Sequence, residues 1–113
     1  MKNLKVNTDE RNFKLKDEPF ENILIHGNTI NSFGIFDEYS MDCSEKSLKR
    51  FKWLLNQIRE YKANVYIICN QKTIDYYQIL LMWFFGFYNV DISNVKLLKE
   101  DYKAEILKQF DEL

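Results

Sequence analysis

The sequence predicts a small α/β domain on the border of the α+β class, with a single-layer mixed sheet of four to five strands. Three helices accompany the strands in the order β-β-α-β-α-β-α. Three observations predict this fold. The length of 113 residues fits one domain. A Gly-Asn pair follows an early apolar run and favours an antiparallel hairpin. Strands and helices then alternate, which implies crossover connections and parallel pairing in that half.

The first 21 residues form a polar arm that precedes the domain of residues 22–113. They mix both charges and contain the only proline, Pro19. Such a composition buries little apolar surface, so we expect at most one short edge strand here, at residues 13–16.

The front of the domain is predicted to be a β-hairpin. A short apolar strand at residues 23–25 meets His26-Gly27-Asn28-Thr29, whose centre suits a two-residue turn. The return strand would cover residues 32–36. His26, next to the turn, is expected to be exposed.

The next segments carry the clearest periodicity. Asp42 and Glu45 form a capping-box pattern, with Ser44 as an alternative cap. Apolar residues at helical spacing then predict a helix over residues 44–62. The continuous apolar run at 64–69 predicts a strand buried on both faces. A further strand is expected at 95–98. An amphipathic helix is expected at 99–113, and its inward-facing residues are Tyr102, Ile106, Leu107 and Phe110.

The most unusual segment is the aromatic-rich run of residues 73–88, which lies between the last two predicted strands. As a helix it has one narrow polar stripe, formed by Asp75, Gln78, Met82, Gly86 and Asn89. A small domain covers only one side of such a helix, so part of its apolar surface needs a partner. The candidate interface residues are Tyr76, Met82, Trp83 and Phe85.

Composition excludes several classes of function. The net charge is -1, so the chain lacks the overall positive field of a nonspecific nucleic-acid binder. Cys43 and Cys69 do not form a metal or redox motif, and we expect a cytoplasmic protein without a membrane span. The abundance of Asn, Ile, Lys, Phe and Tyr is typical of an AT-rich genome.

Candidate chemistry is sparse. Cys69 ends a predicted strand, where a nucleophile could lie, but the loop after it has no glycine to admit an anion. His26 is the only imidazole. Asp37, Glu38 and Asp42 follow a predicted strand and could hold Mg²⁺, although Asp42 already serves as a helix cap. No P-loop, dinucleotide fingerprint or triad signature is present, so we assign no catalytic residue, metal ligand or cofactor.

A second candidate surface is the outer face of the helix at 44–62. Lys49, Lys52, Trp53 and Arg59 would place basic groups beside an aromatic ring, an arrangement that suits nucleic acid or an acidic partner protein. A solvated helix face has the same pattern.

The sequence therefore favours a small cytoplasmic protein-binding module, such as an adaptor, an inhibitor or an immunity-type protein, that acts through the aromatic helix. Its partner would be another protein or a second copy in a homodimer. The alternative is nucleic-acid binding through the basic helix face, and an enzyme that uses Cys69 or the acidic cluster ranks last. No membrane or small-molecule partner is indicated.

Overall fold

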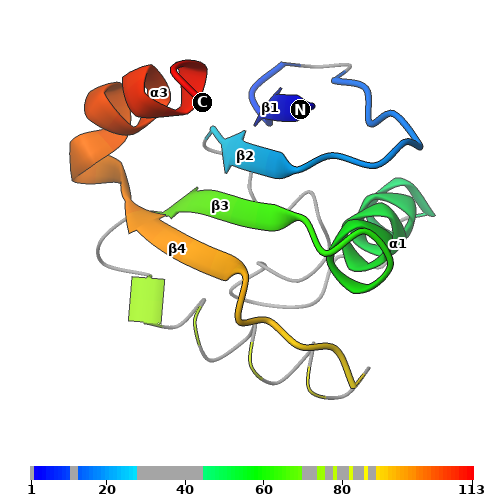
Figure 1. The fold of residues 1–113 in the computed structure, drawn as a ribbon. Coiled ribbons are helices and arrows are strands. Elements are labelled where there is room, and N and C mark those ends of the chain that lie inside the picture. The colour runs from blue at the N-terminus through cyan, green and yellow to red at the C-terminus, as the bar shows by residue number, and fades with distance from the viewer. Residues whose placement is uncertain are drawn as a thin grey trace.

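Among the described residues, four parallel strands form one sheet and two α-helices, α1 and α3, pack against its opposite faces (Figure 1). The computed structural model describes residues 2–10, 13–27, 45–69, 74–75, 78, 82, 86 and 89–113. Its elements are β1 (Asn3–Asn7), β2 (Asn22–His26), α1 (Glu45–Arg59), β3 (Asn64–Cys69), β4 (Val95–Lys99), the short 3₁₀ helix η2 (Glu100–Tyr102) and α3 (Lys103–Asp111).

All described strands are parallel, and their spatial order β1-β2-β3-β4 follows the chain. The register aligns Val6 with Ile25, Ile25 with Ile67, and Ile67 with Leu97. Since side chains in one such row point to the same face, this apolar row defines the face that packs against α1. The neighbouring residues along each strand point to the opposite face.

The larger core lies between the sheet and α1. Leu54, Leu55 and Ile58 recur at helical spacing and are buried against strand residues such as Ile23 and Ile25. Ile74, at the start of the aromatic segment, packs against the same cluster, which places that residue on the α1 side of the sheet.

The opposite face of the sheet is partly covered by α3, which returns from the end of β4 toward β1 (Figure 1). Phe110 is buried against Leu24 and Ile68. The Nζ atom of Lys5 lies 2.9 Å from a carboxylate oxygen of Asp111, and this exposed ion pair joins α3 to β1.

Three asparagines form a ladder across the amino ends of the strands. The side-chain amide of Asn64 donates to Asn22 over 3.2 Å, and the amide of Asn22 donates to Asn3 over 3.0 Å. Their alignment in the strand register brings the three together.

Two sequence-based expectations about the sheet are wrong. The described strands form a purely parallel sheet, and β2 already has β1 on one side and β3 on the other. Both edges of β2 are therefore occupied by parallel partners, which contradicts an antiparallel hairpin built on β2. The predicted return strand, residues 32–36, lies outside the described residues. The edge strand is also misplaced, because it covers Asn3–Asn7 whereas residues 13–16 have no regular structure.

The remaining elements follow the prediction more closely. The helices predicted at 44–62 and 99–113 are present as α1 and α3, with η2 forming the first turn of the second. The strands predicted at 64–69 and 95–98 are β3 and β4. In the aromatic segment, residues 74, 75, 78, 82 and 86 are described and are helical. Within the described part of the chain, no helix is both long and apolar enough to cross a membrane.

Candidate functional site

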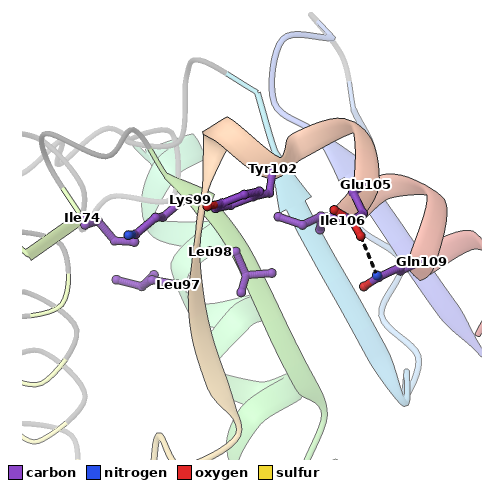
Figure 2. Close-up of a pocket in the computed structure, with 8 residues that line it drawn as sticks. All are labelled: Ile74, Leu97, Leu98, Lys99, Tyr102, Glu105, Ile106 and Gln109. Carbon is purple, nitrogen blue, oxygen red and sulfur yellow. Dashed lines mark hydrogen bonds between the residues drawn. The ribbon is translucent and has the colours of Figure 1, made fainter.

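The described surface is hollowed where β4 ends and α3 begins. This hollow has a volume of about 450 Å³ and reaches around the edge of β4, from Leu97 on the α1 side to Leu98 on the α3 side (Figure 2). Its lining residues are Ile74, Leu97, Leu98, Lys99, Tyr102, Glu105, Ile106 and Gln109. The prediction that Tyr102 faces inward is wrong, because its side chain is 59% exposed. An aromatic side chain is therefore available to a partner.

A second hollow of about 340 Å³ continues the first beneath α3. It shares Leu98, Ile106 and Gln109 with the first hollow and extends over Tyr66 and Lys96 on the sheet. We name the two together the β4 groove. Each volume is within the range of ordinary ligand and peptide pockets, and the shared lining is mainly apolar.

The outer edge of β4 borders the groove, and the hydrogen bonds of β4 show which of its N–H groups point toward β3 and which point away. Val65 N–H donates to the carbonyl of Asn94 over 2.9 Å, whereas the N–H of Val95 donates back to Ile92. Because backbone groups alternate in direction along a strand, the N–H groups of Leu97 and Lys99 point away from β3. No described strand pairs with this outer edge of β4.

Charged side chains lie on both sides of the groove. Lys96 and Lys99 on β4 are exposed, and neither forms an ion pair with a described residue. Glu105 on α3 is also exposed and accepts a hydrogen bond from the Gln109 amide over 3.4 Å (Figure 2). The groove therefore has an apolar floor with basic groups on the strand side and one carboxylate on the helix side.

Cys69 ends β3 on the α1 side of the sheet and is only 2% exposed. Burial raises the pKa of its thiol to about 12. At neutral pH the side chain is therefore a thiol and lacks the character of an activated nucleophile.

His26 does not lie beside Cys69 on one face. Ile25 faces the α1 side together with Ile67 and Cys69, so His26, one residue further, points to the opposite face. This geometry separates the two side chains that a Cys/His dyad would need. The expectation that His26 is exposed is also wrong, since its residual exposure is 8%.

The predicted basic surface lies on α1. Lys49, Lys52 and Arg59 are exposed, as a phosphate-binding surface requires. Trp53, however, packs against the core and donates its indole N–H to the carbonyl of Lys16 over 2.9 Å. Its role in base stacking therefore has no structural support, and nucleic-acid binding stays a prediction that rests on the three cations.

The polar stripe of the aromatic segment is described, and all five of its residues are exposed, with Met82 60% exposed. The other three predicted interface residues, Tyr76, Trp83 and Phe85, lie outside the described residues. The acidic cluster of Asp37, Glu38 and Asp42 lies outside them as well.

Comparison with protein-family models, with curated proteins and with solved structures finds no match. The function of this chain must therefore be argued from its own surfaces. Sequence reasoning had not singled out the β4 groove. The one local signal is the pair of lysines in the short strand Val95–Lys99, since lysine is common on exposed edge strands.

Proposed function

We propose that this chain is a small protein-binding module and that the β4 groove is part of its binding surface. The observation that carries the proposal is an apolar hollow beside an edge strand with outward-pointing backbone groups. Backbone groups at a sheet edge supply binding energy for an extended segment, while hollows on both sides of the strand receive its alternating side chains.

The residue types in the groove support the same conclusion. Leu97, Leu98 and Ile106 offer apolar surface, and the exposed ring of Tyr102 lies at one end. Tyrosine is enriched at interfaces because it combines a large apolar ring with a hydrogen-bonding tip.

The aromatic segment extends this proposal on the other side of the sheet. Ile74 lines the groove and packs against the α1-side core, so the segment starts directly beside the edge of β4. A partner that reached past the edge would meet this helix next, and Met82 already presents an exposed apolar side chain. The aromatic helix and the groove would then act as one surface.

The test compares two exposed tyrosines. Peptides of twelve residues are selected from a displayed random library on the wild-type protein, and their affinities are measured by fluorescence anisotropy for Tyr102→Asp and Tyr61→Asp. Tyr102 is exposed and its side chain makes no capping hydrogen bond to α3, so this change should preserve the fold. Tyr61 is 39% exposed, does not line the groove and serves as the control.

We expect Tyr102→Asp to weaken binding of the selected peptides by about tenfold or more, as for an interface anchor, with no effect of Tyr61→Asp. Failure to select any peptide on monomeric protein would contradict the proposal. Equal affinity for wild type and Tyr102→Asp would also contradict it.

A further inference from the structure

We propose that the partner at the β4 edge is a second copy of this chain, which pairs antiparallel through its own β4 so that the described strands of both copies form one continuous sheet. This self-pairing rests on the proposed protein-binding role of the groove and names its occupant. Three features of β4 support it: the direction of its backbone groups, the apolar residues at its centre, and charge complementarity across the two-fold axis.

The direction of the backbone groups restricts pairing to registers in which outward-pointing residues oppose one another, and we place the two-fold axis at Leu97. The outward-pointing residues of β4 are Val95, Leu97 and Lys99, and a two-fold axis at Leu97 places each of them opposite another outward-pointing residue. Leu97 pairs with Leu97 of the second copy, and Lys99 pairs with Val95. The N–H of Val95 is already used by Ile92, so the expected inter-chain donors are Leu97 and Lys99 in each copy.

The same register places lysine opposite leucine. Lys96 of each copy stands across from Leu98 of the other, on the α3 side of the sheet. Leu98 shares its hollow with Glu105, so each Lys96 ammonium comes near a carboxylate of the other copy. The two-fold axis forms this complementary pair twice, whereas centring the pairing on Lys96 would oppose two like charges.

The apolar side chains complete the interface. Leu97 faces the α1 side, where Ile74 lines the groove, and Leu98 faces Ile106 on the α3 side (Figure 2). Pairing would bring the Leu97 side chains together and would cover the edge that is open in the described monomer. Exposed lysines disfavour edge pairing where two of them stand opposite each other, and the register centred on Leu97 avoids this for Lys96 and Lys99.

The first test removes one donor without disturbing the monomer. Lys99 has φ of -76° and ψ of 132°, values that proline adopts, and its N–H points away from β3. Lys99→Pro should therefore fold as the wild type does, as checked by circular dichroism. The dimer dissociation constant, from sedimentation equilibrium, should rise by about tenfold or more because two inter-chain hydrogen bonds are lost.

The second test exchanges the charges. Lys96→Glu and Glu105→Lys should each weaken the dimer about fivefold or more, and the double variant should return to within about twofold of wild type. Lys108→Glu, an exposed change on α3 outside both hollows, is the matched control and should leave the dissociation constant unchanged. A double variant as weak as either single one overturns the register.

Amide hydrogen exchange gives an independent readout. The Leu97 and Lys99 amides should be protected in the dimer and exchange rapidly on dilution to monomer, while the Lys96 and Leu98 amides, which face β3, stay protected in both states. A dimer in which Leu97 and Lys99 exchange rapidly overturns the pairing.

The outcomes separate this inference from the proposed function. A wild type that is monomeric at all concentrations but binds selected peptides through Tyr102 overturns self-pairing and leaves the binding module intact. A dimer that neither Lys99→Pro nor the charge exchange changes also overturns self-pairing, and places self-association on another surface. Equal peptide affinity for wild type and Tyr102→Asp counts against the proposed function only.

Discussion

His26 combines near-complete burial with an unsatisfied ring nitrogen. Its Nδ1 atom has no hydrogen-bond partner among the described residues, while its backbone carbonyl accepts bonds from the N–H and the hydroxyl of Thr8. Burial is the main cause that lowers the pKa of His26 below its ordinary value of 6.5. Lys103 on α3 and Lys5 on β1 lower this pKa further, against the opposing effect of Asp9 and Glu10 after β1.

This lowered pKa predicts a pH-dependent stability. The unfolded chain binds a proton at His26 more readily than the folded one, so stability is fully present above pH 6.5 and falls as the pH drops below it toward the folded value. We expect the free energy of unfolding in urea to decrease between pH 6.5 and pH 5. His26→Leu should remove this decrease.

Asp91 also has a lowered pKa, caused mainly by its hydrogen bond from the Ser93 amide, but its ordinary value of 3.8 places its titration below this window. A decrease of equal size in wild type and His26→Leu would show that another group is responsible.

Gly27 shows why one residue misled the prediction of a hairpin. Its φ of +120° requires glycine, which the sequence suggested through the Gly-Asn pair. The cause is a close approach of the segment after β1, because a Cβ atom at Gly27 would collide with the Thr8 hydroxyl and lie 2.9 Å from the Asp9 nitrogen. A glycine next to a strand indicates a positive φ or a close backbone contact, but the sequence does not show which segment makes that contact.

At the level of elements, the sequence predicted best where apolar residues are frequent. The helical spacing over α1 and the continuous apolar run of β3 each indicate one kind of structure. In β1 only Leu4 and Val6 are apolar, so five residues of an edge strand could not be distinguished from a polar arm. The signal that separates them is the pairing with β2, which is a tertiary contact.

Gln57 joins the N-terminal segment to α1. Its side chain is fully buried, its oxygen accepts the Phe20 N–H over 3.3 Å, and its amide donates to the Glu18 carbonyl over 2.8 Å. One side chain thus satisfies a donor and an acceptor of a segment without regular structure. These bonds hold residues 18–20 against the helix in place of a strand partner.

Replacing Gln57 with methionine keeps the length of the side chain and removes both bonds. Each backbone group left unsatisfied costs about 1–3 kcal/mol, so we expect Gln57→Met to lower the free energy of unfolding in urea by roughly 2 kcal/mol or more. Lys52→Met, at an exposed position of the same helix, is the control and should change stability by about 0.5 kcal/mol or less. Equal effects of the two changes would contradict the role of Gln57.

For the whole molecule, the α/β class could be predicted from the sequence, whereas the β4 groove could not. Alternating strands and helices predicted parallel pairing in the second half, and the described sheet is parallel throughout. The β4 groove could not be predicted, because its lining depends on α3 folding back over the sheet, which brings Ile106 and Gln109 beside Leu98. Helical periodicity identified Ile106 as inward-facing without showing that its neighbours leave a hollow.

The two faces of the sheet are covered unequally. Among described residues, thirteen are buried in the core on the α1 side, whereas Leu24, Ile68 and Phe110 are the three buried beneath α3. The ion pair between Lys5 and Asp111 is exposed and adds little. We therefore expect α3 to open while the sheet and α1 stay folded, as the least stable cooperative unit of the domain.

Two phenylalanine-to-alanine substitutions, one on each side of the sheet, test whether α3 opens independently, by native-state amide hydrogen exchange. Phe110→Ala removes the main anchor of α3, at a cost of about 3 kcal/mol or more, and should abolish protection of α3 amides such as that of Leu107 while β2 and β3 amides stay protected. Phe51→Ala removes a buried phenylalanine from the larger core and should lower protection in β2, β3 and α1 together. If Phe110→Ala unfolds the sheet along with α3, the domain is a single cooperative unit. Selective loss in α3 would mean that the helix side of the β4 groove, which carries Glu105 and Ile106, can move independently of the strand.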